Sequence, residues 1–271
     1  MTRGARFDVL LVLAAAPAAV FLGKPLWQDS AVYSSVFTPG VLIWVGVLSK
    51  LALLAVGVAL GYGSARRFER GNPIRPAWML LATGLLAFLL GQLSLAPYQL
   101  FLNTPVPFPS VADVFFLIAY PFLTVAVAAF VSGYGKAGFP LGSAGERWGI
   151  AVVVVLVCAA LGYAVLAPIV RAEIPPIEKV LNTTYPVLDF ILLIPTFVLL
   201  RITLRMRGGQ VGRIWLMLLA GFVFVCVGDT LFAYLSSLGF AQLDPVVDAL
   251  YILAYAFLAR GTVRQHELLT S

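Results

Sequence analysis

The stretch PSVADVFFLIAYPFLTVAVAAFV (109–131) decides the fold, because it is an apolar run long enough to cross a bilayer. After Asp113 no charged residue follows until Lys136. A helix of about 20 apolar residues spans the hydrocarbon core of a membrane. Inside that core every backbone group must be paired within the segment, so an unbroken apolar run of this length is expected to be helical. The stretch therefore predicts a transmembrane helix over 112–133.

Seven further runs of the same kind predict eight transmembrane helices in all. Composition agrees, since the chain of 271 residues is 61% hydrophobic and only 11% charged, with a mean hydropathy of +0.99. Soluble domains carry about 25% charged residues. We therefore expect an all-α polytopic membrane protein without a soluble domain. Its expected helices are 8–27, 38–62, 77–97, 112–133, 148–169, 179–203, 214–237 and 246–263.

The net charge of +6 comes from basic residues in the loops between the apolar runs, and it does not indicate a nucleic-acid-binding surface. The two ends of the chain and alternate connections hold 14 of the 18 lysines and arginines, for example in SARRFERGNPIRPA (64–77) and RITLRMRGGQVGR (201–213). The opposite connections hold Lys24, Arg171 and Lys179. This distribution is the positive-inside pattern, and it predicts that both termini are cytoplasmic. Membrane lipids are the expected partners, and nucleic acid is not.

The chain repeats itself. WMLLATG (78–84) corresponds to WLMLLAG (215–221), and PSVADVFFLIAYPF (109–122) corresponds to DPVVDALYILAYAF (244–257). Internal similarity at one spacing indicates duplicated structural units. We therefore expect two parallel four-helix repeats, 1–140 and 141–271, related by a pseudo-two-fold axis along the membrane normal. The second repeat is expected to end in a short cytoplasmic tail, LARGTVRQHELL (258–269).

Ionisable residues inside the predicted spans are costly, and such residues usually face the interior of a bundle. Lys50 and Asp189 lie in corresponding helices, each roughly 16 Å from the outer end of its helix. We expect them to pair near the midplane, because pairing is the cheapest way to keep a charge in low dielectric. Asp113 and Asp248 are expected to open their helices, where a carboxylate caps free N–H groups.

Spacings of three and seven residues put further polar and aromatic side chains on shared helix faces. These faces are expected to converge into an outward-opening pocket between the repeats. A structural hydrogen-bond network between helices would use the same residue types, so both interpretations stay open. The residues of this predicted network or ligand site are Lys50, Gln92, Gln99, Asp113, Tyr120, Asn182, Tyr185, Asp189, Asp229, Asp248, Tyr251 and Tyr255.

Four motifs carry a family resemblance: PSVADVFFLIAYPF (109–122), TYPVLDFILL (184–193), GDTLFAYL (228–235) and DPVVDALYILAYAFLA (244–259). Together they resemble the multi-span membrane sensor regions of bacteria that precede diguanylate cyclase, phosphodiesterase or histidine kinase modules. The resemblance implies a multi-pass protein of the bacterial cytoplasmic membrane that signals through its cytoplasmic side, to another membrane or cytoplasmic signalling protein. No cyclase or kinase sequence follows within the chain, which is expected to be a stand-alone relative or the membrane part of a longer protein. The residues that match are Asp113, Tyr120, Pro121, Tyr185, Pro186, Asp189, Asp229, Asp248 and Tyr255.

The leading interpretation is a sensor or ligand-binding module without catalytic output. The only histidine, His266, lies in the predicted tail, so no intramembrane histidine-based metal site is expected. The sequence assigns no catalytic residue, metal or cofactor. Three alternatives stay open: an accessory structural subunit of a membrane complex, a small transporter, and an aspartate-dependent membrane lipid hydrolase. Paired carboxylates working as acid and base would serve the last of these.

The charge distribution makes a testable prediction about orientation. Reporter fusions at Ser271 and within the 97–111 connection should report opposite sides of the membrane, with Ser271 in the cytoplasm, because the basic connections stay inside. A periplasmic signal from the Ser271 fusion would overturn the predicted topology.

Overall fold

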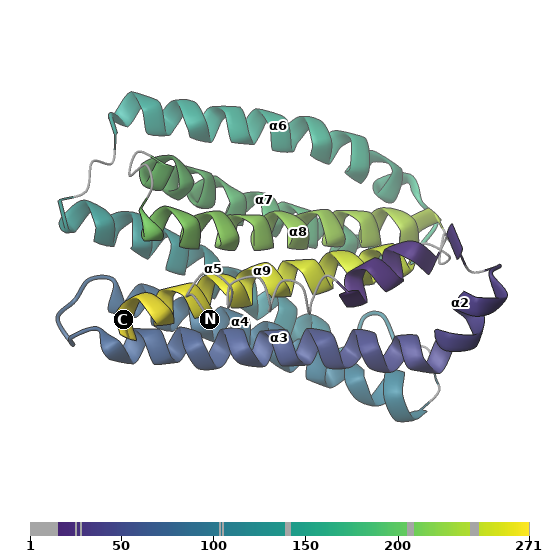
Figure 1. Ribbon diagram of the computed structural model, residues 1–271. Helices are drawn as coiled ribbons and strands as arrows, with labels where there is room; N and C mark the ends of the chain where they lie inside the picture. The colour runs from purple at the N-terminus through teal and green to yellow at the C-terminus, as the bar shows by residue number, and fades with distance from the viewer. Residues whose placement is uncertain are drawn as a thin grey trace.

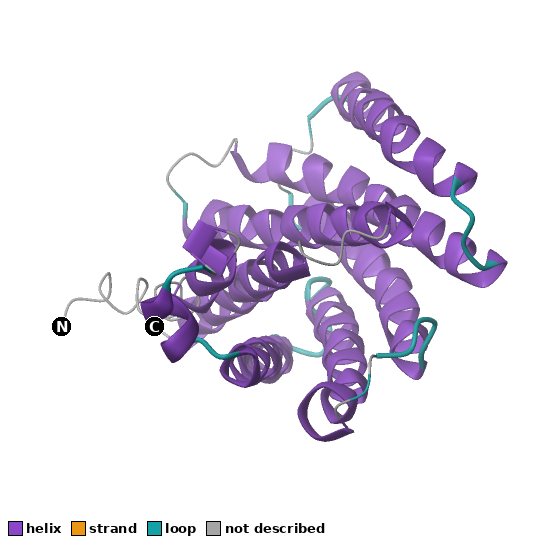
Figure 2. Cartoon of the chain, turned by 90° about the vertical axis from the view of Figure 1, so that its right-hand side faces the viewer, coloured by secondary structure: helices purple, strands orange, loops and turns teal. Residues whose placement is uncertain are grey.

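The computed structural model describes residues 16–24, 26–27, 29–102, 104, 106–138, 142–204, 209–238 and 244–270. Within these ranges the chain is helical with short connections and contains no strand (Figure 2). The fold is therefore all-α, as the apolar runs predict. The first expected helix, 8–27, is described from residue 16, where it is helical at 16–24 and 26–27; the rest of it lies outside the described residues.

Seven of the described helices are long and apolar enough to span a membrane. Each of the seven corresponds to one of the remaining expected runs and extends past it by a few residues at one end or both, since the helices continue beyond the apolar core into their connections; α3 alone begins one residue later than expected. The described residues also form the short helix α2 (Ala31–Val36), labelled in Figure 1, and the π-helical turn η1 (Tyr98–Leu102). The seven are α3 (Pro39–Arg67), α4 (Arg75–Pro97), α5 (Val111–Lys136), α6 (Ala144–Arg171), α7 (Pro176–Leu204), α8 (Gln210–Leu238) and α9 (Asp244–Thr270).

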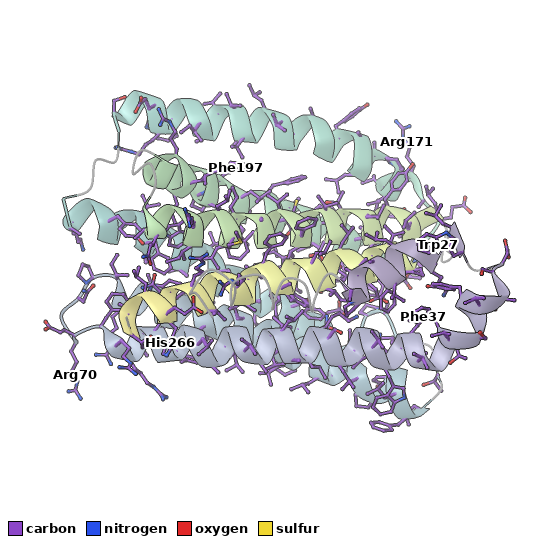
Figure 3. The ribbon with its side chains drawn as sticks, in the orientation of Figure 1. Trp27, Phe37, Arg70, Arg171, Phe197 and His266 are labelled. Atoms are coloured by element: carbon purple, nitrogen blue, oxygen red, sulfur yellow. The ribbon has the colours of Figure 1, made fainter. Side chains whose placement is uncertain are left out.

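Helix α9 lies inside the bundle, between α3 and α8 (Figure 1). In its apolar stretch 61% of the residues are buried, against 13% for α6, which packs at the edge on α7 and α8. Arg70 and His266 lie at one end of the bundle and Arg171 and Trp27 at the other (Figure 3). The connections that the charge pattern assigns to opposite sides therefore lie at opposite ends.

The segment expected to be a tail is instead the last three turns of α9. The helix continues to Thr270, and the side chains of Arg260, Thr262 and Gln265 are buried. Gly261 lies so close to α8 that a Cβ there would be 2.6 Å from Leu218. The expected end of this helix at 263 was therefore too early, because polar residues do not end a helix when the neighbouring helices are long enough to pack on it.

Two helix pairs, α4–α5 and α8–α9, approach closely at glycines. A Cβ on Gly84 would lie 2.6 Å from Leu123, and one on Gly221 would lie 2.6 Å from Leu258. Seven residues further on, Gly91 meets the ring of Phe116 and Gly228 meets the ring of Tyr251. Small residues allow membrane helices to pack closely, and packing drives their association where lipid supplies no hydrophobic force. The contacts occur at positions that correspond in the two repeated sequences.

The repeated tryptophans meet on one ring. Trp78 of α4 and Trp215 of α8 both pack edge-on against Phe130 of α5, with ring centroids 5.2 and 4.6 Å away. The indole N–H of Trp215 donates to the Tyr134 hydroxyl at 3.0 Å. Edge-to-face aromatic pairs of this kind add about 0.5–1.5 kcal/mol each beyond their buried area. They join the α4–α5 pair to the α8–α9 pair at the end of the bundle opposite the polar residues of the predicted site.

Close packing at Gly221 can be tested by one methyl group. We expect Gly221→Ala to lower the free energy of unfolding by about 1–3 kcal/mol, because the new Cβ overlaps Leu258 and must push α8 from α9. Gly149→Ala in α6 is the matched control, since no atom lies within 4 Å of its Cβ position. Thermal unfolding in detergent measures both. Equal melting of the Gly221 variant and the wild type would contradict the close contact.

Candidate functional site

A cavity of about 500 Å³ lies among the helices at the end where α4 stops and α5 begins. Its volume falls in the range of small-molecule sites, which bury most of their ligand between mixed apolar and polar walls. Residues from α3, α4, η1, α5, α7, α8 and α9 line it, together with the connection at 106–110. Ten of the twelve predicted residues line this cavity: Lys50, Gln92, Gln99, Asp113, Tyr120, Tyr185, Asp229, Asp248, Tyr251 and Tyr255.

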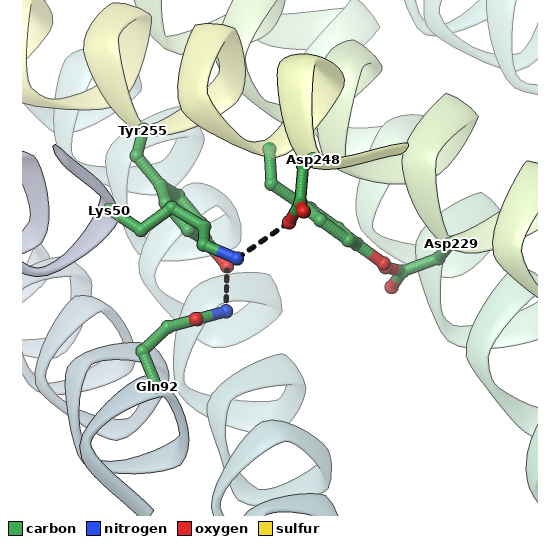
Figure 4. A network of polar contacts seen from close by, with 6 residues as sticks. Lys50, Gln92, Asp229, Asp248 and Tyr255 are labelled. Carbon is green, nitrogen blue, oxygen red and sulfur yellow. Dashed lines mark hydrogen bonds and ion pairs between the residues drawn. The ribbon is translucent and has the colours of Figure 1, made fainter. Parts of the chain in front are cut away.

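Lys50 forms an ion pair with Asp248, with Nζ 2.7 Å from Oδ1 (Figure 4). The lysine is buried, whereas 36% of the aspartate side chain is exposed. The expected pair of Lys50 with Asp189 was therefore wrong. Helix α3 packs along α9, so the carboxylate within reach of Lys50 belongs to α9 and not to α7. Both residues also line a second space of about 440 Å³.

Asp113 opens α5 as a capping residue. The backbone N–H and the hydroxyl of Ser110 both donate to Asp113 Oδ2, at 2.6 and 3.2 Å, and Ser110 Oγ accepts from the N–H of Ala112. This reciprocal capping box satisfies free donors at the start of the helix. The other oxygen, Oδ1, accepts a hydrogen bond of 2.7 Å from the Tyr185 hydroxyl of α7. Asp113 thus caps α5 and faces the cavity at once.

Asp248 has a different position from the one expected. Helix α9 starts at Asp244, so Asp248 lies in its second turn and does not open the helix. The physical reason is that Pro245 suits the first turn of a helix, where no backbone N–H is needed. With its helix already started, the Asp248 carboxylate is free to reach Lys50.

Asp229 of α8 is held by tyrosine hydroxyls. Tyr120 donates to Oδ2 and Tyr251 donates to Oδ1, each at 2.5 Å. The Tyr120 oxygen also lies 2.9 Å from Asp189 Oδ1 on α7. The second oxygen of Asp189 is buried without a hydrogen-bond partner. Asp229, Tyr120 and Asp189 therefore form one connected group, in which Asp229 faces the cavity and Asp189 lies behind Tyr120.

The amide of Gln92 donates to the Tyr255 hydroxyl at 3.2 Å, beside the Lys50–Asp248 pair (Figure 4). Phe88, one turn before Gln92 on α4, packs against the rings of Tyr120 and Tyr255, with centroids 6.1 and 6.2 Å away. Tyr251 and Tyr255 stack at 6.2 Å with an angle of 17° between their planes. One side of the cavity is thus a continuous aromatic surface.

Asn182 and Asp189 are the two predicted residues that do not line the cavity. Asn182 is buried between α7 and α8, where its amide lies 3.4 Å from the hydroxyl of Ser236. They belong to an interhelical network, whereas the ten others face open space. Both interpretations of the sequence pattern, pocket and structural network, thus describe part of the same arrangement.

Several lining residues carry no polar signal in the sequence and were missed. Phe88 and Leu95 of α4 were within reach of prediction, because each is one helical turn from Gln92 on the same face. Phe108 and Phe232 pack on each other with centroids 5.8 Å apart, and they join the 106–110 connection to α8. Nothing in the local sequence of an apolar helix distinguishes such a residue from one that faces lipid.

The lining residues supply carboxylates, amides, hydroxyls and aromatic rings. Among the described residues no three histidine, cysteine, aspartate or glutamate side chains are placed to hold a metal ion together. The lining residues include no histidine or cysteine, and the hydroxyl of Ser110 is engaged in the cap of α5. The Asp113, Asp229 and Asp248 carboxylates each accept hydrogen bonds from side chains that hold them in place.

Comparison with known proteins found no protein-family model, no curated protein and no solved structure that matches the chain.

The geometry predicts which charges are coupled. Asp248→Asn should destabilise the protein more than Lys50→Met, because it leaves a buried ammonium group unpaired, whereas the aspartate is partly exposed. We expect a loss below the roughly 3–5 kcal/mol of fully buried pairs, and partial recovery in the double variant. Unfolding of the two single variants and the double variant in mixed micelles measures this coupling. Asp189→Asn with Lys50→Met is the control, and coupling there as strong as with Asp248 would contradict the assigned pair.

Proposed function

We propose that this protein is a ligand-binding membrane module that works as a sensor without catalytic output of its own. The observation that carries the proposal is the cavity of about 500 Å³, which residues from both halves of the chain line together. A ligand held there would contact α3, α4, α5, α7, α8 and α9 at once. Its binding would therefore change how the two halves pack, and a ligand shifts a conformational equilibrium by its different affinity for the two states.

The proposal includes eight spans arranged as two parallel four-helix repeats, with 8–27 as the first span. Pairs of corresponding contacts support it. Lys50 of α3 meets Asp248 of α9, and Tyr185 of α7 meets Asp113 of α5. Each contact joins the second helix of one half to the fourth helix of the other. The contact of Gln92 with Tyr255 corresponds in the same way to that of Asp229 with Tyr120.

The orientation we propose places both termini in the cytoplasm of a bacterium and the cavity towards the outer side of its inner membrane. The basic connections support it, because they lie at the end of the bundle remote from the cavity. Helix α9 then joins the two sides. It lines the cavity through Asp248 and Tyr255 and continues, with buried side chains, to Thr270. A signal would pass along this helix to a partner at the cytoplasmic end.

Filling the cavity tests the proposal. Leu95 of α4 lines the cavity and is only partly buried, so Leu95→Trp should occupy part of the space without breaking the fold. We expect native mass spectrometry of the wild type, released from bilayer discs, to show a small molecule retained at one per chain, and the Leu95→Trp variant to lose it.

The matched control is Leu93→Trp, on the outer face of the same helix, where the leucine is 46% exposed. This variant should retain the molecule as the wild type does. Retention by both variants would contradict binding in the cavity, and so would a wild type without any retained molecule in preparations from cells.

A further inference from the structure

We infer that the cavity binds an organic cation, with an ammonium group on Asp229 and an apolar body along the aromatic surface. The inference rests on the proposed binding function and names the chemical class of the ligand. It depends on three observations. The first is which partner each charged residue of the cavity has, and the second is which of Asp189 and Asp229 holds a proton in their contacts with the Tyr120 hydroxyl. The third is the set of aromatic rings around Asp229.

The charges that line the cavity are three carboxylates and one ammonium group. Lys50 is bound to Asp248 at 2.7 Å, so these two compensate each other. Asp113 lies at the N-terminus of α5, where the helix dipole and the Ser110 donors stabilise its negative charge. Asp229 has neither form of compensation. It lies far from either end of α8, and among the described residues no lysine, arginine or histidine forms an ion pair with it.

Counting hydrogens shows which carboxyl group carries the negative charge. Tyr120 has one hydroxyl proton, yet its oxygen lies within hydrogen-bond distance of both Asp189 and Asp229. A hydroxyl can donate to only one of them, so the other group must donate a proton to Tyr120. If Asp189 is that donor, Asp229 accepts from Tyr120 and from Tyr251, and every proton is used.

The opposite arrangement is less favourable. It would put the charge on Asp189, which is 1% exposed, receives one hydrogen bond and has a second oxygen without a partner. A buried charge with unsatisfied lone pairs is costly. The negative charge therefore belongs on Asp229, the carboxylate that faces the cavity, and Asp189 holds the proton behind it.

The surroundings of Asp229 suit a cation with an apolar body. Tyr251 and Tyr255 present stacked rings, and Phe88, Phe116 and Tyr120 continue the surface. Cations are attracted to the faces of such rings, and the attraction is stronger in sites from which water is excluded. An anionic ligand would instead face three carboxylates, with the one lysine already paired. The corresponding residue in the first half is the neutral Gln92, so a carboxylate at 229 is not needed for the packing of the repeat.

Three probes of one shape and different charge test this inference on the purified full chain in maltoside micelles: 1-naphthylmethylamine, 1-naphthylmethanol and 1-naphthoate. We expect the amine to bind the wild type at least tenfold more tightly than the alcohol, and the carboxylate to bind most weakly. Asp229→Asn should remove the advantage of the amine and leave the affinity for the alcohol within about twofold. Asp189→Asn should lower the affinity for the amine less than threefold, because Asp189 is already neutral in the wild type.

Asp29→Asn is the matched control, because it makes the same substitution in the exposed connection before α2. It should leave the affinities of all three probes unchanged. If the alcohol or the carboxylate binds the wild type as tightly as the amine does, the cation inference is wrong while the binding function stands. If no probe binds, and Leu95→Trp and the wild type retain the same molecules, the proposed function fails as well. The comparison of probes on the wild type remains decisive even if Asp229→Asn does not fold.

The ammonium group has two possible sources, a free amine or the headgroup of an aminophospholipid. Addition of phosphatidylethanolamine to the micelles distinguishes them. Displacement of 1-naphthylmethylamine by the lipid assigns the site to a headgroup, and undisturbed binding assigns it to a free amine. Displacement by phosphatidylglycerol, which has no ammonium group, would contradict a cation site.

Discussion

The structure depends on close approach between helices at glycine. In lipid, apolar side chains gain nothing from leaving their surroundings, so helices associate through packing and interhelical hydrogen bonds. At Gly84 and Gly221 no side chain separates the paired helices, and Leu123 and Leu258 fill the space that a Cβ would take. These contacts fix α5 against α4 and α9 against α8. All carboxylate-bearing faces of α5, α8 and α9 are positioned by them, and so is the cavity between the two pairs.

On this frame, polar contacts at corresponding positions of the two halves differ in charge. Tyr185 of the second half meets Asp113 of the first, whereas Lys50 of the first half meets Asp248 of the second. Where one half has Gln92 beside a tyrosine, the other has Asp229. The helices pack in the same way at these corresponding positions, but the charges of the contacting residues differ. The cavity between the halves is therefore lined by charged and neutral residues at corresponding positions, as with Asp229 and Gln92, which two identical halves would lack.

Much of this architecture could be predicted from the sequence, because apolar run length and helix periodicity are local properties. Nine of the ten cavity residues were accessible for the same reason, since they lie on helix faces marked by spacings of three and seven, and Lys50 was accessible as a charge within an apolar run. The partner of Lys50 was not. Pairing depends on which helices touch and on their relative height, and neither is encoded in one helix. Sequence symmetry suggested that corresponding helices face each other across the axis, whereas α3 packs on α9 and α7 on α5. The buried end of α9 was missed because Arg260 and Gln265 are polar, and polarity alone indicates a tail.

The ion pair of Lys50 and Asp248 also faces two spaces at once. Both residues line the cavity of about 500 Å³ and a second space of about 440 Å³, and Gln99 and Val106 line both as well. A compact molecule in the first space would leave the pair intact. A longer molecule that reached past these residues into the second space would have to pass beside the pair, and separating the two charges would be costly because Lys50 is buried. Two residues on the neighbouring helices α3 and α9 would thus favour compact molecules over long ones.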